Sequence, residues 1–479
     1  MSIINSAGRS LFLMFLASLS LAQGVDTSKP DPGKLESHLD PVAEDLMRRL
    51  YAPGMAVAVV KDGKVILKKG YGFSNVESKT PVDPSKTIFR IGSITKVFTA
   101  NAALILEEEG KIGLDTDVKK YLNGLKIGGA YKGVMTVRNL LTHTSGLDEF
   151  SAGRRSETAA GVKPLKDFLS DRLVARTEPG RQISYSTYGI TLAGYIVEDI
   201  SGQPLSKFFE DSIFRPLEMN STNLGVVPES RKNDLAVGYT FNGQYNPQPF
   251  EYFHTYPASD INSTADDMAN YILAHLGGGR FKGNKVFDDS TSGLMHHVQF
   301  KNHERLPGWA VGFYETYDNN LKGIEHGGSM EGFAALLYLL PEKDLGIFVA
   351  SNIEQGRLMS GMKQAVLDYF YPVSSSPDDP EEFAKLKRFE GRYRWDVYCH
   401  TCPPDSRGFF PRPFEVTLNN DSTISFFGNR WKPVGHLTFK AILNDDREIF
   451  AAFKEDESGN ITFLFHGSNA YERVAEEAK

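Results

Sequence analysis

The sequence has 479 residues and a formal charge of −7, and 41% of its residues are hydrophobic. A chain of this length holds two or three domains of ordinary size, or one large domain with a small one, and its hydrophobic content can fill a sizeable core. No long basic block is present, so we do not expect nucleic acid as a partner, because duplex binding needs a concentrated positive face.

Residues 1–22 have the features of a secretory signal peptide. Arg9 precedes the apolar run LFLMFLASLSLA, and Ser20 and Ala22 are small residues at the spacing that signal peptidase recognises. The alternative is an uncleaved membrane anchor, but about a dozen apolar residues fall short of the roughly 20 that span a bilayer. We therefore expect cleavage near Ala22, a secreted or periplasmic protein, and no stable membrane insertion after cleavage.

Residues 23–375 are expected to form one large domain. Its first part, 23–40, is polar and proline-rich, which is typical of a tail. The two apolar runs on either side of Asp62-Gly63 predict a β-hairpin over 54–72. Helical spacing of apolar residues predicts four helices, and two strand-like apolar runs predict two strands. These are helices within 37–54, 94–110, 188–202 and 359–371, and two strands over 334–352 joined around Pro341–Asp344.

The composition changes near residue 375. A stretch rich in proline, serine and aspartate indicates a linker, which we place at 376–384. Beyond it, alternating apolar runs separated by Asn-Asp and Gly-Asn turns predict a small antiparallel β domain over 385–479.

The only two cysteines, Cys399 and Cys402, stand in a CHTC segment within this β domain. A local disulfide, two free thiols, and a metal or redox site are the three possible states. Zinc normally takes four ligands, and an oxidising compartment favours a disulfide. We therefore expect a disulfide and no metal.

Ser93 and Lys96 stand three residues apart in FRIGSITKVFTA, where a helix is predicted to begin. Residues i and i+3 share a helix face, so the hydroxyl and the amine should point into the same space. The plain alternative is an N-cap serine beside a solvated lysine.

Two further segments strengthen the catalytic interpretation. EPGRQISYSTYG places Tyr185 on a loop just before a helix, which is a usual location for catalytic groups. In HGGSMEGF, the glycines after His326, among them Gly328, would let a ligand approach the backbone closely. Taken singly, these segments would be a packed tyrosine and a hairpin turn with a surface histidine.

Taken together and in this order, the segments resemble the serine β-lactamase and penicillin-binding-protein superfamily, and more closely its class C-like branch of secreted hydrolases, D-peptidases and esterases. The resemblance spans about residues 50–370. It includes the SxxK stretch, LLTHTSGL (140–147), the Pro-Gly…Tyr-x-x loop, and HGGSMEGF in place of a Lys-Thr-Gly strand. It implies an α/β (α+β) fold with an antiparallel sheet flanked by helices and an all-helical lobe. The C-terminal segment resembles the lipocalin-like β domain of some members.

The chemistry of this site can be argued from the side chains. Ser93 is the candidate nucleophile, and its hydroxyl needs a base. No GxSxG elbow is present to suggest that a Ser-His-Asp triad supplies this base. Partial burial and the positive end of a helix would lower the pKa of Lys96 and let its amine serve. A cationic lysine would also stabilise the phenolate of Tyr185. We therefore treat Lys96 and Tyr185 as a coupled pair that shares one proton.

The resemblance assigns further roles. It implies that Tyr185 passes a proton to the leaving group, and that the backbone N–H groups of Ser93 and Ser329 form the oxyanion hole. His326 stands where many relatives have lysine, and it would bind a substrate carboxylate or tune Tyr185. Thr187 replaces the usual asparagine, which weakens the case for efficient β-lactam hydrolysis, because threonine offers only a short hydroxyl.

We therefore expect a secreted serine hydrolase that acts through a serine acyl-enzyme on a small-molecule or peptide substrate, without a cofactor. A β-lactam, a D-amino-acid peptide and a carboxylic ester all stay open as substrates. The alternative is a catalytically weak penicillin-binding or scaffold protein that retains the fold. The oligomeric state is not predictable from the sequence.

Overall fold

The structure is a computed structural model. It describes residues 32–304, 306–319, 321–372, 386–403, 409–419, 423–435, 437–443, 449–456, 458–467 and 469–474. The expected signal peptide (1–22) and linker (376–384) lie outside these ranges. Within them, every helix is too short or too polar to cross a bilayer.

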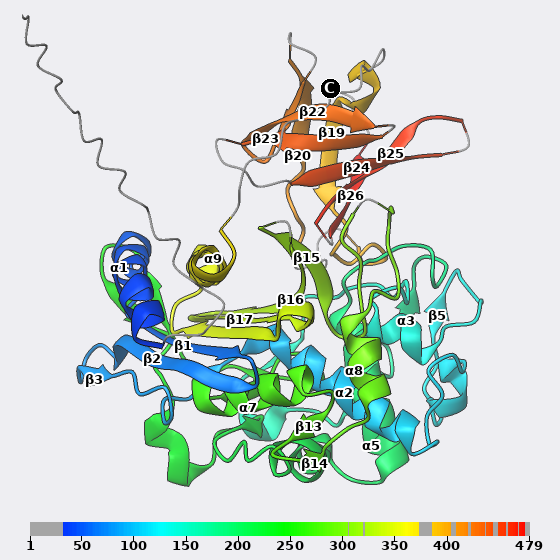
Figure 1. Cartoon of the computed structure of the whole chain (residues 1–479). Helices are drawn as coiled ribbons and strands as arrows, with labels where there is room; N and C mark the ends of the chain where they lie inside the picture. The colour runs from blue at the N-terminus through cyan, green and yellow to red at the C-terminus, as the bar shows by residue number, and fades with distance from the viewer. Residues whose placement is uncertain are drawn as a thin grey trace, which may run out of the picture.

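A seven-stranded antiparallel sheet forms the centre of the large domain (Figure 1). Its strands lie in the order β15-β16-β17-β18-β1-β2-β3. Asp62 and Gly63, with φ angles of 51° and 68°, make the tight turn of the expected hairpin, and this turn matches the right-handed twist of the two strands. The strands span β1 Gly54–Lys61, β2 Lys64–Asn75, β3 Thr80–Pro81, β15 Tyr314–Asp318, β16 Leu321–Met330, β17 Phe333–Leu340 and β18 Leu345–Ser351.

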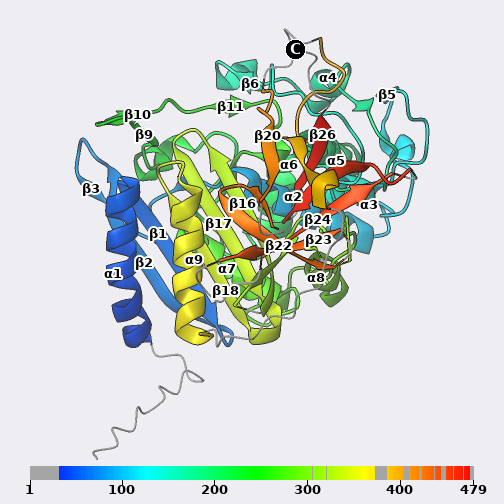
Figure 2. The same cartoon turned by 90° about the horizontal axis from the view of Figure 1, so that it is seen from above.

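Helices cover both faces of the sheet, as the resemblance implied. Helices α1 and α9 lie side by side on one face (Figure 2), and α2, α5 and α7 lie with the shorter helices on the other. The longer helices span α1 Pro32–Leu50, α2 Thr95–Glu108, α5 Thr187–Ser201, α7 Ala265–Leu276, α8 Asp289–His296 and α9 Gly356–Phe370. The shorter ones span α3 Val137–Leu141, α4 Leu165–Leu169 and α6 Leu205–Phe209.

The expectation of a polar tail over 23–40 is wrong from Pro32 onward, where α1 begins. Leu35, Leu39 and Ala43 recur every four residues, so they form one apolar stripe on the helix. All three are fully buried. Polar residues between these positions hide the stripe in the sequence, and the helix is held by its packing.

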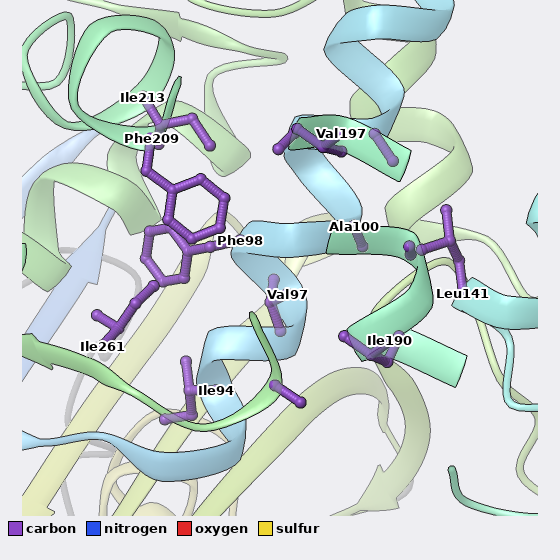
Figure 3. Close-up of a cluster of buried hydrophobic side chains, with 14 of the residues drawn as sticks. Ile94, Val97, Phe98, Ala100, Leu141, Ile190, Val197, Phe209, Ile213 and Ile261 are labelled. Atoms are coloured by element: carbon purple, nitrogen blue, oxygen red, sulfur yellow. The ribbon is translucent and has the colours of Figure 1, made fainter. Parts of the chain in front are cut away.

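Helix α2 lies at the centre of the larger hydrophobic core. Its residues from Thr95 to Leu106 are all buried, so it is surrounded by protein on every side. Figure 3 shows Ile94, Val97 and Phe98 packed among side chains from several other segments. Burial of each such side chain is worth about 1.5–3 kcal/mol. This packing fixes the position of the helix, and with it the residues at its start.

The C-terminal residues form a closed, eight-stranded antiparallel barrel, which confirms the small β domain. The barrel lies on the side of the molecule where β15 and β16 end the sheet (Figure 1). Cys399 and Cys402 form a disulfide, so the first of the three alternatives is confirmed. The strands span β19 Gly391–Trp395, β20 Phe414–Leu418, β21 Ile424–Phe426, β22 Asn429–Gly435, β23 Thr438–Ile442, β24 Phe450–Glu455, β25 Ile461–His466 and β26 Asn469–Val474.

Candidate active site

Ser93 lies in a single 3₁₀ turn, Gly92–Ile94, that leads directly into α2. This turn packs closely against strand β16. A Cβ atom added to Gly92, whose φ is +52°, would lie 3.0 Å from the backbone nitrogen of Ser329. One added to Gly328 would lie 1.9 Å from the carbonyl oxygen of Ile91. Glycine at these two positions therefore brings the backbone of Ser93 and the backbone of Ser329 together.

Lys96 lies one turn further along α2 and is directed at the serine. Its Nζ donates hydrogen bonds to the Ser93 Oγ at 3.0 Å and to the carbonyl oxygen of Ala258 at 2.9 Å. Burial lowers the pKa of Lys96 from 10.5 to about 7, with Glu149 raising it in part and Arg154 lowering it further. A neutral amine beside the hydroxyl can accept its proton.

Tyr185 lies on the loop before α5, as expected. Its ring stacks on His143 at a centroid distance of 4.4 Å, and the Lys96 Nζ lies 4.9 Å from the ring centroid. Burial raises the pKa of Tyr185, whereas a side-chain hydrogen bond with Ser93 lowers it in part. The free protein therefore favours a neutral phenol beside a neutral amine above pH 7, so the proton is held by the phenol.

His143, from the LLTHTSGL segment, supports this loop. Its Nδ1 accepts the backbone N–H of Ser186 at 2.9 Å, and its ring also meets the edge of Trp309. Burial lowers the pKa of His143 well below its usual value. The ring is therefore neutral, and its contacts orient Tyr185.

His326 and Gly328 are described residues that do not line the cavity around Ser93. His326 donates from Nδ1 to the carbonyl oxygen of Gly327 at 2.7 Å, and its ring lies 6.2 Å from that of Tyr185. Burial, together with the charge of Lys96, lowers the pKa of His326 to about 3. His326 is therefore a neutral neighbour of the tyrosine at physiological pH.

A partly buried ion pair that sequence reasoning missed acts electrostatically on Lys96. Glu149 accepts a hydrogen bond from the backbone N–H of Thr187 at 2.9 Å and pairs with Arg154 at 3.1 Å. Arg154 also donates to the Thr187 hydroxyl at 3.4 Å. Burial raises the pKa of Glu149, and the charges of Arg154 and Lys96 oppose this. Glu149 follows LLTHTSGL by two positions, and this proximity was the only signal in the sequence.

The candidate catalytic side chains open into a cavity of about 630 Å³, a volume typical of small-molecule sites. Ser93, Lys96, Tyr185, Thr187 and Ser329 all line it. The barrel also contributes to its wall, a role that the sequence left undecided for this domain; the contributing residues are Trp395, Val397, Tyr398 and Phe409.

Two buried carboxylates dock the barrel segment onto the large domain. Asp148 of the large domain accepts the backbone N–H groups of His400 and Thr401, both at 2.8 Å. Asp396 of the barrel accepts hydrogen bonds from Arg176 and Gln182, both at 3.0 Å. Donor atoms of Asp396, His400 and Glu472 also lie within 4.8 Å of one another, as in a metal site. Asp396 is already paired with Arg176, so we assign this carboxylate to docking.

The antiparallel sheet has helices on both faces, and α2, which carries the SxxK pattern, lies in the larger core. Together these features define a β-lactamase/transpeptidase-like fold. The model of the Beta-lactamase family matches residues 39–369, and the chain belongs to that family.

Two curated relatives are similar to part of the chain. Protein flp of Staphylococcus aureus (strain N315) is 27% identical over 328 residues, covering 66% of this chain and 63% of flp. The putative penicillin-binding protein PbpX of Bacillus subtilis (strain 168) is 29% identical over 265 residues, covering 53% of this chain and 65% of PbpX. The match thus spans less than two thirds of either relative.

Solved structures extend the similarity to the barrel. The octameric penicillin-binding protein homologue from Pyrococcus abyssi has a TM-score of 0.62 and 25% identity, covering 92% of this chain and 99% of its own. SurE has a TM-score of 0.66 at 20% identity, with 92% and 99% coverage. A class C β-lactamase has a TM-score of 0.59 at 24% identity and covers only 71% of this chain and 98% of its own. The last two likenesses indicate the fold alone.

Proposed function

We propose that this protein is an exported serine hydrolase that cleaves an amide or ester bond through an acyl-enzyme on Ser93. The observation that carries the proposal is the 3.0 Å hydrogen bond between the Lys96 Nζ and the Ser93 Oγ. The lysine is fully buried, and its pKa is lowered to about 7. A hydroxyl needs such a base to become a nucleophile.

Acylation depends on proton transfers among Ser93, Lys96 and Tyr185. The Ser93 Oγ attacks the substrate carbonyl carbon while its proton passes to the neutral amine of Lys96. When the tetrahedral intermediate collapses, the bond to the leaving group breaks, and Tyr185 gives that group its phenolic proton. The Lys96 ammonium then returns a proton to the phenolate, and water releases the acyl group by the same route in reverse.

The intermediate carries an oxyanion, which the backbone N–H groups of Ser93 and Ser329 stabilise in this proposal. Support comes from the close packing of their two segments at Gly92 and Gly328. One such preorganised donor is worth about 3–4 kcal/mol. Gly328 therefore acts through the close approach of its backbone to the serine turn.

Thr187 and His326, the other side chains that the resemblance places at the substrate, have different support. Thr187 lines the cavity, so its hydroxyl is within reach of substrate. His326 is buried and neutral. We therefore propose that it acts as a neutral ring beside Tyr185 and not as a cation for a carboxylate.

Turnover assays on the purified protein test the proposal and separate the substrate classes. We would assay nitrocefin, a D-alanyl-D-alanine peptide and p-nitrophenyl acetate with wild type, Ser93→Ala and the control Ser78→Ala. Ser78 is exposed on the turn between β2 and β3, so its loss should change the rate by less than twofold. Turnover of any substrate that disappears only in Ser93→Ala supports the hydrolase, and the substrate turned over gives the class.

Turnover that persists in Ser93→Ala excludes Ser93 as the nucleophile. Absence of turnover with every substrate would favour the alternative, a catalytically weak penicillin-binding or scaffold protein.

A further inference from the structure

Side chains from the barrel form an apolar wall of the cavity that contains Ser93. Trp395, Val397, Tyr398 and Phe409 line this cavity, and Phe253 and Met330 of the large domain extend the apolar surface. We call the four barrel side chains the barrel wall. The rings of Trp395 and Phe409 meet edge to face, at a centroid distance of 6.3 Å.

Phe409 is an exposed member of the barrel wall. Its side chain is 52% exposed, although transfer of a phenyl ring out of water is favourable. The ring stands at the same cavity as the nucleophile, so a bound substrate would cover it. An exposed apolar surface that continues into a reactive cavity is typical of a ligand-binding site.

The barrel wall is held in place by polar contacts. The backbone N–H of Phe409 donates to the hydroxyl of Ser151, and Asp148 and Asp396 dock the segment between Trp395 and Cys402. Asp148 and Asp396 are almost fully buried, and breaking such bonds is costly. The wall is therefore preorganised and does not need to assemble on binding.

The charges at the cavity leave room for an apolar group. Arg154 is paired with Glu149, and Arg155 is paired with Glu251 at 2.8 Å. Both guanidinium groups already have a carboxylate partner. We therefore expect the apolar surface to contribute more to the free energy of substrate binding than the arginines do.

We propose that the barrel completes the active site as an aromatic subsite, and that the substrates are esters or amides with an aromatic or bulky apolar group beside the scissile carbonyl. This inference rests on the proposed function for its reaction and names the substrate class. A phenyl group in such a subsite should raise kcat/KM by at least tenfold over a methyl group, since one methylene in an apolar pocket already gives about 10–200-fold.

Three methyl- or benzyl-type esters test the inference by proton release. Methyl acetate has no aromatic group, methyl phenylacetate has one on the acyl side, and benzyl acetate has one on the leaving group. We would measure kcat/KM for each with wild type, Phe409→Ala, Trp395→Ala and Phe427→Ala. Phe427 is the matched control, because it is a barrel phenylalanine of similar exposure, 43%, outside the cavity lining.

We expect wild type and Phe427→Ala to prefer at least one aromatic ester over methyl acetate by tenfold or more. Phe409→Ala and Trp395→Ala should each reduce this preference about tenfold. If Trp395→Ala fails to fold, the exposed Phe409 still gives the test, since truncation at the surface is tolerated. A wild type without preference, or a Phe409→Ala variant that matches Phe427→Ala, would overturn the inference.

A binding experiment separates failure of the subsite from failure of the chemistry. In the Ser93→Ala background, titration calorimetry with methyl phenylacetate and benzyl acetate compares Phe409→Ala with Phe427→Ala. A Kd about tenfold weaker in the Phe409→Ala protein supports the subsite even if Ser93 is not the nucleophile. Equal Kd values in the two proteins refute it.

Discussion

The pH dependence of acylation should report the burial of Lys96. Burial lowers the pKa of Lys96 from 10.5 to about 7, which corresponds to about 5 kcal/mol against the ammonium at 1.36 kcal/mol per unit. Only the neutral amine can accept the serine proton. The logarithm of kcat/KM should therefore rise with unit slope below pH 7 and level off above it, and the rate at pH 5 should be about 100-fold below the plateau.

Two variants test the electrostatic origin of this titration, because they should move it in opposite directions. The carboxylate of Glu149 raises the pKa of Lys96, and the guanidinium of Arg154 lowers it. Glu149→Gln should therefore shift the rising limb to lower pH, and Arg154→Met should shift it to higher pH. The readout is the position of the limb, so a loss of substrate affinity in either variant does not obscure it.

The assay is hydrolysis of p-nitrophenyl acetate from pH 5 to 9 at constant ionic strength, with the buffer rate subtracted. A rate that is flat across this range, or one that still climbs steeply at pH 9, would refute the buried-amine reasoning. So would a shift in the same direction for both variants.

Two other substitutions follow from close contacts. Gly328→Ala should lower kcat about 10²–10³-fold, because its Cβ would lie 1.9 Å from the Ile91 carbonyl and displace one oxyanion donor, whereas at Gly327 the closest atom would be 3.7 Å away. A Gly328→Ala enzyme as active as Gly327→Ala would contradict this packing argument. Asp148→Asn should destabilise the protein by about 2–4 kcal/mol, measured as a lower urea midpoint, because it weakens buried charge-assisted hydrogen bonds to His400 and Thr401. The surface control Asp45→Asn should change stability by less than about 0.5 kcal/mol, and equal midpoints for both variants would argue against docking by Asp148.

Local patterns in the sequence predicted the elements that local chemistry determines. Asp62-Gly63 predicted a hairpin because both residues take a positive φ in its turn. The start of α1 was missed because its buried stripe only becomes visible against α9. Helix α7 was expected only within a mixture of short helices and loops over 205–280, although Thr264 caps it by accepting the N–H of Asp267 and its apolar residues recur at helical spacing.

The candidate site also combines contacts that are local in the sequence with contacts between distant segments. Ser93 and Lys96 are three residues apart on one helix, so their geometry follows from helical periodicity. Glu149 and Arg154 act on Lys96 across more than 50 positions, and Trp395 and Phe409 reach the cavity from the other end of the chain. Such contacts depend on tertiary packing, and a single sequence carries no periodic signal of that packing.

The most direct test of the acyl-enzyme claim is to trap the nucleophile. A fluorophosphonate probe, added at pH 8 where the Lys96 amine is neutral, should add one label per chain by intact mass, and peptide mapping should place it on Ser93. A label on another residue, or equal labelling of the Ser93→Ala protein, would contradict the account.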